Sequence, residues 1–154
     1  MMASSPYIVT KGVVLRETET RDADKILTLL TAERGKLSVI ARGVCRKGCK
    51  FAACAQPLAY SEWTLYKKGD WYYANEGATL ELFNGFRADL DAMALGFYLA
   101  ELTEAVTTED APHQGLLSHL INGLYAVSVL RKPLPLVKAA FEIKLLCLAG
   151  YEPL

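Results

Sequence analysis

Residues 26–41 read ILTLLTAERGKLSVIA, and they give the clearest indication of the fold. Residues 26–31 are apolar and β-branched, and residues 36–41 alternate polar with apolar side chains, which is the period of a half-buried strand. Between them, residues 33–35 are typical of a hairpin turn, because Gly35 can adopt a positive φ at little cost. The stretch therefore predicts a β-hairpin.

Three more strands are expected around this hairpin, at residues 7–15, 58–66 and 71–80. The stretch at 42–50 is rich in Gly, Lys and Arg and cannot be an interior element. Five short strands favour a small closed or nearly closed barrel, because closure removes the exposed strand edges. The first half of the chain is therefore predicted to be a β-barrel.

The second half changes to a helical period, with apolar residues three and four apart over 90–106, 116–127 and 134–148. Pro112 and Pro135 stand where helices begin, and Gly150 stands where the last one ends. The third helix is expected to be the buried one, because a second apolar stripe runs along it: Leu136, Ala140, Ile143 and Cys147. We expect an α+β chain, with a barrel at 1–82 and a helical domain at 83–154.

The charge balance also differs between the two halves of the chain. The chain has 154 residues, 52% of them hydrophobic, with 17 basic and 17 acidic side chains, as in ordinary globular proteins. A net charge of zero argues against a chain that binds nucleic acid or a membrane surface all over. Residues 1–70 nevertheless carry 12 Lys or Arg and 7 Asp or Glu. This excess of basic residues in one half is a hint of nucleic-acid contact.

The excess is concentrated between residues 34 and 50, where there is no acidic residue. The six basic residues there are the predicted DNA-binding set: Arg34, Lys36, Arg42, Arg46, Lys47 and Lys50. The neighbouring strands carry many aromatic residues: Phe51, Tyr60, Trp63, Tyr66, Trp71, Tyr72 and Tyr73. Cations that neutralise phosphates, beside rings that stack on bases, indicate a site for single-stranded nucleic acid. The alternatives are a mobile solvated loop for the basic run and barrel core for the rings.

Signatures of catalysis, cofactors and metals are absent from the sequence, so no enzyme is predicted and no cofactor or metal is expected. Cys45, Cys49 and Cys54 lack the paired spacing of a structural zinc site, although zinc binding or a reactive thiol there stays open as an alternative. The sequence shows no signal peptide and no apolar run long enough to span a membrane. A cytoplasmic protein with reduced cysteines is expected.

Several stretches resemble the bacterial recombination mediator family RecO. They are residues 14–16, 29–35 and 41–47 in the first half, and 86–90, 98–102, 141–146 and 150–153 in the second. The resemblance implies an N-terminal OB-fold followed by a helical domain. It also implies binding of single- and double-stranded DNA, annealing of complementary strands, and help for RecA in displacing single-strand-binding protein, together with RecR. A bacterial, nucleoid-associated location follows from the same resemblance.

One departure from the family concerns the C-terminal end. The Gly-Tyr-x-Pro motif at 150–153 is commonly followed in the family by a cysteine-rich zinc module, whereas this sequence stops at Leu154. The helical domain is expected to be truncated there, in either a fragment or a naturally short member. A second hypothesis is a protein-interaction adaptor for single-strand-binding protein or RecR. Its partner-binding residues would be Arg131, Lys132 and Lys138, beside apolar side chains.

Overall fold

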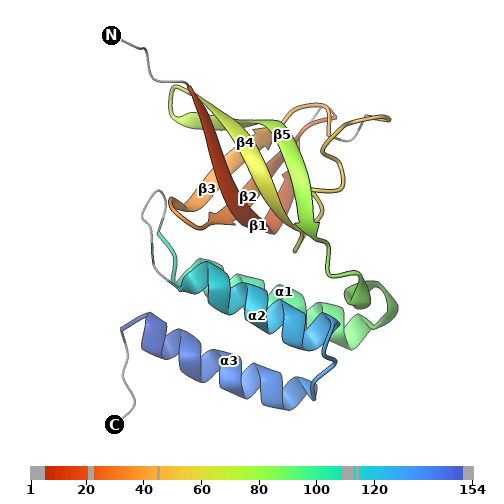
Figure 1. Ribbon diagram of the computed structural model, residues 1–154, viewed down its shortest axis with the longest axis vertical. Helices are drawn as coiled ribbons and strands as arrows, with labels where there is room; N and C mark the ends of the chain where they lie inside the picture. The colour runs from red at the N-terminus through yellow and green to blue at the C-terminus, as the bar shows by residue number, and fades with distance from the viewer. Residues whose placement is uncertain (1–5, 21–22, 45, 109–112, 114, 151–154) are drawn as a thin grey trace.

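The computed structural model describes residues 6–20, 23–44, 46–108, 113 and 115–150 (Figure 1). Cys45, Pro112 and residues 151–153 of the Gly-Tyr-x-Pro motif lie outside these residues. The strands are β1 (Tyr7–Glu19), β2 (Lys25–Thr31), β3 (Gly35–Ala41), β4 (Tyr60–Lys68) and β5 (Trp71–Glu81). A 3₁₀ helix, η1 (Asn84–Ala88), leads into α1 (Leu90–Ala105), α2 (Leu116–Ser128) and α3 (Leu134–Leu148).

The strands form a closed barrel in the order β1-β2-β3-β5-β4. All neighbours are antiparallel except β3 and β5, which pair in parallel. β1 pairs with β4 through its first half and with β2 from Gly12 onward, and the β1–β2 pairing has an irregularity between Val14 and Arg16. The predicted five-stranded barrel and the α+β fold class, with an OB-fold first, are confirmed.

Alternation along the strands fills the barrel with apolar side chains. On β3, for example, Leu37 and Val39 are buried while the residues between them are only half-buried. The same alternation buries Trp63 and Leu65 on β4. These side chains belong to one apolar cluster inside the barrel, which also contains Tyr72.

A second apolar cluster joins the barrel to the helices. Val13, Leu15 and Leu30 contribute to it from the strands, and Phe83, Phe86, Leu99 and Leu120 are among the residues that contribute from the segments after them. The division into residues 1–82 and 83–154 stays a prediction, and the two parts are packed on one another through this shared core. The cluster orients the barrel relative to the helical layer.

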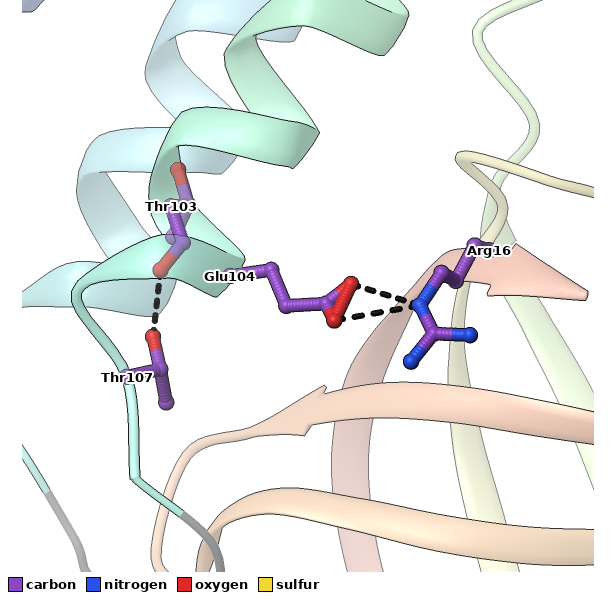
Figure 2. Close-up of polar contacts among 4 residues, drawn as sticks. All are labelled: Arg16, Thr103, Glu104 and Thr107. Carbon is purple, nitrogen blue, oxygen red and sulfur yellow. Dashed lines mark hydrogen bonds and ion pairs between the residues drawn. The ribbon is translucent and has the colours of Figure 1, made fainter.

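A polar contact accompanies this packing. Arg16 on β1 donates from Nε to both carboxylate oxygens of Glu104 on α1, at 2.7 and 3.1 Å (Figure 2). One residue earlier on α1, Thr103 is buried, and its carbonyl accepts a hydrogen bond from the Thr107 hydroxyl (Figure 2). The Arg16 side chain is 60% exposed, so the ion pair contributes little to stability compared with the apolar contacts beside it.

The expectation that the third helix is the buried one is wrong. α2 is the central helix, and α3 lies against α1 and α2 on the side away from the barrel (Figure 1). The second apolar stripe of α3 faces outward, with Leu136 60% and Ile143 58% exposed. The physical reason is that a second apolar stripe makes a helix more apolar overall. It does not determine which of the three helices packs between the other two.

Candidate nucleic-acid interface

The basic run continues into a loop that begins at one end of the barrel, where β3 finishes. We call residues 42–50 the basic loop, and we call the end of the barrel where β3 and β4 finish and β5 begins the distal end. This end lies away from the helices (Figure 1). Apolar residues in and just after the loop, Val44 and Cys54, are buried in the barrel cluster, and Phe51 packs edge-on against Trp63 at 6.1 Å between ring centroids. The loop is therefore anchored to the core.

Polar contacts fix the path of the loop further. The Gly43 amide donates to the Asp24 carboxylate at 2.6 Å, and Gly43 takes a φ of 67°, which favours glycine. The Arg46 amide donates to the Gly43 carbonyl at 3.0 Å, and the Cys49 amide donates to the Arg46 carbonyl at 3.3 Å. Consecutive turns of this kind give the loop a defined backbone course.

Four of the predicted DNA-binding residues lie together on this loop. Arg42, Arg46, Lys47 and Lys50 are all exposed. Since their neighbours Val44 and Cys54 point into the core, the loop presents its charges to solvent and its apolar residues to the barrel. Four cations on an anchored loop form a surface suited to an extended polyanion.

The other two predicted DNA-binding residues lie elsewhere. Arg34 is in the β2–β3 turn, and the Lys36 amide donates to the carbonyl of Thr108, just beyond α1, at 3.4 Å. β3 rises by about 3.3 Å per residue, so Lys36 and Arg42 are about 20 Å apart along the strand. Lys36 and Arg42 therefore mark two ends of the barrel, and the six residues do not form one cluster.

The structure also separates the aromatic residues into core and surface. Trp63 and Tyr72 are buried in the barrel, and Tyr60 packs against the cluster that the helices share. Tyr66 and Tyr73 are half-buried on the outer face, because their strand neighbours Leu65 and Tyr72 point inward. Trp71 is 45% exposed at the start of β5.

The outer rings lie side by side across three strands. Tyr7 on β1 is the register partner of Tyr66 on β4, and Tyr66 is the register partner of Tyr73 on β5. The Tyr7 and Tyr66 ring centroids are 5.5 Å apart, and the Arg42 guanidinium carbon lies 4.7 Å from the centroid of the Tyr73 ring. Sequence reasoning missed Tyr7, whose place beside Tyr66 depends on strand register.

These residues line a hollow at the distal end. It has a volume of about 420 Å³, and the residues around it are Tyr7, Arg42, Tyr66, Lys68, Tyr73, Ala74 and Asn75. The lining holds two cations and three tyrosine rings, and no acidic side chain belongs to it. The basic loop and the aromatic surface therefore meet at Arg42.

Of the three residues predicted to bind a protein partner, Arg131 and Lys132 line one hollow, and Lys138 does not line it. Lys132 lines an apolar groove of about 340 Å³ between α2 and α3. The hollow that Arg131 and Lys132 share lies beside η1 and the start of α1, and Arg131 does not line the groove. Lys138 donates to Glu142 at 3.0 Å, and Tyr98 on α1 donates to the same carboxylate, also at 3.0 Å. These two hydrogen bonds hold the pKa of Glu142 below its ordinary value.

Sequence reasoning missed a second cation of the α2–α3 groove. Lys144 lines it together with Lys132, and the apolar lining includes Leu136, Val137 and Phe141. The signal was present in the sequence, since Lys144 follows Leu136 and Ala140 at intervals of eight and four residues and so shares their helix face. The groove combines an apolar floor with two positive charges.

Two of the cysteines, Cys49 and Cys54, contact the barrel cluster. Cys54 is buried with its Sγ 3.3 Å from Thr79 Oγ1, Cys49 is half-buried, and Cys147 is exposed. Among the described residues, no three His, Cys, Asp or Glu side chains gather in a group that could hold a metal ion. In the same part of the chain, no helix has the length and apolarity needed to cross a membrane.

Fold and site together define a class: a five-stranded OB-type barrel with a basic, aromatic end, packed on a helical bundle. The family model for the N-terminal part of recombination protein O matches residues 2–83, and the model for its C-terminal part matches residues 87–154. The chain belongs to the recombination protein O (RecO) family.

Individual relatives agree with the family models. The protein named DNA repair protein RecO from Acetivibrio thermocellus is 36% identical over 148 residues, which cover 96% of this chain and 59% of the relative. The protein of the same name from Caldicellulosiruptor bescii is 33% identical over 144 residues, covering 94% of this chain and 59% of the relative. The chain spans about three fifths of the length of these relatives.

Proposed function

We propose that this chain binds DNA in DNA repair and recombination, and that the distal end of the barrel is its DNA-binding surface. The observation that carries this proposal is the anchored basic loop, with Arg42, Arg46, Lys47 and Lys50 exposed. Each phosphate that a cation neutralises releases condensed counterions, and this release drives association. Membership of the RecO family supports the role in repair.

The finer activities are those that the family resemblance implies. We propose that the chain binds single- and double-stranded DNA, anneals complementary strands, and helps RecA to load onto DNA coated by single-strand-binding protein, acting with RecR in a RecF-type pathway. Two complementary strands repel one another through their phosphates, and a surface with four cations lowers this repulsion while they pair. No covalent step is involved in such a mechanism.

The test is the salt dependence of single-strand binding. The affinity of the chain for a fluorescein-labelled 15-mer of deoxythymidine is measured between 50 and about 300 mM salt, a range in which binding falls steeply. Replacing Arg42, Arg46, Lys47 and Lys50 by Ala removes four phosphate contacts. The slope of log K against log salt should therefore flatten by about 3 units.

A charge-matched pair of variants controls this experiment. Arg46→Ala/Lys47→Ala removes two charges from the basic loop, and Arg16→Ala/Arg87→Ala removes two exposed charges from elsewhere on the surface. The first pair should flatten the slope by about 1.4 units and the second should leave it unchanged. Equal slopes for the two pairs would exclude the basic loop from the site.

A second candidate function is a protein-interaction adaptor, favoured by the α2–α3 groove. The groove has an apolar floor and the cations Lys132 and Lys144, which suits a short acidic peptide with an apolar end. The tail of single-strand-binding protein has this chemistry. DNA contact would then be secondary, and the helical part would carry the partner site.

This candidate predicts that Lys132→Glu/Lys144→Glu abolishes binding of an acidic, apolar-ended nonapeptide, measured by fluorescence anisotropy. Arg131→Ala should have no effect, because Arg131 lines a different hollow. Peptide binding that survives the double charge reversal would rule out the groove.

A further inference from the structure

The tyrosine ladder is an aromatic surface made by Tyr7, Tyr66 and Tyr73 on the outer face of β1, β4 and β5. Cross-strand register places the three side chains in one row, at right angles to the strands. Tyr7 is 49% exposed, and the other two rings are half-buried. The interior of the barrel is filled by Trp63, Leu65, Tyr72 and their neighbours, so this row is not needed to complete the core.

The hollow beside the ladder has the size and lining of a ligand site. Its volume of about 420 Å³ falls in the range of small-molecule pockets, which is roughly 300–1,000 Å³. The Arg42 guanidinium carbon lies 4.7 Å from the centroid of the Tyr73 ring, and Lys68 lines the hollow from β4. The rings offer π-faces and the two cations offer partners for anions, within one hollow.

The opposite side of the barrel lacks such a surface. OB-type barrels frequently bind oligonucleotides on the face of strands 2 and 3. In this chain the outer positions of β2 and β3 include Ile26, Ser38 and Ile40, and none of these is aromatic. The rings capable of stacking are on β1, β4 and β5 instead.

We propose that the tyrosine ladder is a base-stacking platform for single-stranded DNA, with Arg42 and Lys68 holding the phosphates on either side of the stacked base. This inference rests on the proposed DNA-binding function and deepens it. An unpaired base exposes both of its faces to a ring, whereas the bases of a duplex are already stacked on one another. The ladder therefore selects single strands, while the basic loop attracts either form.

The test separates stacking from charge. Tyr66→Ile/Tyr73→Ile keeps a residue that favours strands at each position but removes both rings. Its affinity for the deoxythymidine 15-mer should fall about 5- to 150-fold per ring that stacks. The salt slope and the affinity for a 15-base-pair duplex should stay as they are, because no phosphate contact is lost. Tyr66→Phe/Tyr73→Phe should bind like the unmodified chain.

The DNA provides a second test that needs no variant. An abasic 15-mer keeps the phosphates but has no base to stack, so the unmodified chain should bind it more weakly than the deoxythymidine 15-mer at equal salt. Photo-cross-linking with 5-iododeoxyuridine should label Tyr66 or Tyr73, as read by peptide mass mapping. These two experiments on the unmodified chain test base stacking even if the Ile variant does not fold.

Different outcomes contradict different parts of the account. Equal binding of the abasic and deoxythymidine strands, or an Ile variant that folds and binds single strands normally, would overturn the stacking platform while leaving DNA binding by the basic loop intact. A loss of single-strand and duplex affinity by the same factor would also overturn it. No binding of either DNA at 50 mM salt would overturn the proposed function itself.

Discussion

His119 is a buried titratable side chain that joins α2 to α3. Its Nε2 lies 3.0 Å from the Phe141 carbonyl, to which it donates, and its ring stacks on the Phe141 ring with the centroids 4.0 Å apart. Burial lowers the pKa of His119, the hydrogen bond to the carbonyl acts in the opposite direction, and the charge of Lys144 adds to the lowering. The folded protein therefore prefers the neutral imidazole.

This preference predicts a pH dependence of stability. Below the ordinary His pKa of 6.5 the unfolded chain takes up a proton more readily than the folded one, so the stabilisation is complete above that pH and is lost as the pH falls. The free energy of unfolding in urea should decrease from pH 7.5 to 5.5. His119→Gln can still donate to the carbonyl but does not titrate, so its decrease should be smaller.

Protonation of carboxylates changes the free energy of unfolding equally in the unmodified chain and in the variant. The difference between the two decreases therefore reports the contribution of His119. A decrease that is the same in both proteins would show that His119 is not held neutral by its surroundings. The pKa itself can be followed through the imidazole proton resonances, and a value at or above 6.5 would contradict the burial argument.

For some residues of the site the sequence predicts whether the side chain is exposed or buried, and for others it does not. The exposure of Arg42, Arg46, Lys47 and Lys50 was predictable, because a run of like charges without acids is unfavourable in an interior. The inward direction of Trp63 and Tyr72 and the outward direction of Tyr66 and Tyr73 were not. They depend on strand register, and a shift of one residue would exchange the two sets.

At the scale of elements, the strands were predicted closely because alternation is a local property of the chain. The main difference is β1, which continues to Glu19 rather than stopping at Leu15. Its last residues are charged or polar and pair with β2 while remaining largely exposed, so no apolar pattern marked them. Helix order in the bundle was not predictable, since both α2 and α3 carry apolar stripes.

The placement of α3 gives a prediction about two residues on one helix. Phe141 is buried, so Phe141→Ala should cost about 3–5 kcal/mol of unfolding free energy through lost packing and the cavity left behind. Ile143 is 58% exposed, and Ile143→Ala should change stability by less than about 0.5 kcal/mol. Urea unfolding monitored by circular dichroism measures both.

The pair is matched because both substitutions replace a large apolar residue by Ala near the middle of the same helix. Helix propensity therefore favours both variants and does not explain a difference between them. Comparable costs for the two variants would mean that the outer stripe of α3 is buried after all, as its sequence alone suggested.

In the whole molecule, the positive and negative charges that sum to zero are separated in space as well as along the sequence. The basic loop lies at the distal end of the barrel, and the more acidic second half forms the helices on the other side (Figure 1). This separation gives the chain an orientation toward a polyanion. Sequence could predict the excess in each half, but not that Arg34 and Lys36 would lie at the end near the helices.

Chemical-shift mapping can show whether the distal end of the barrel binds single-stranded DNA. The ¹⁵N-labelled chain is titrated with the unlabelled deoxythymidine 15-mer at 50 mM salt, and the shift of each backbone amide is followed. We expect the largest shifts in the basic loop and at residues 66–75, with the α2–α3 groove unaffected. Shifts confined to α2 and α3, with none at the distal end, would contradict this expectation.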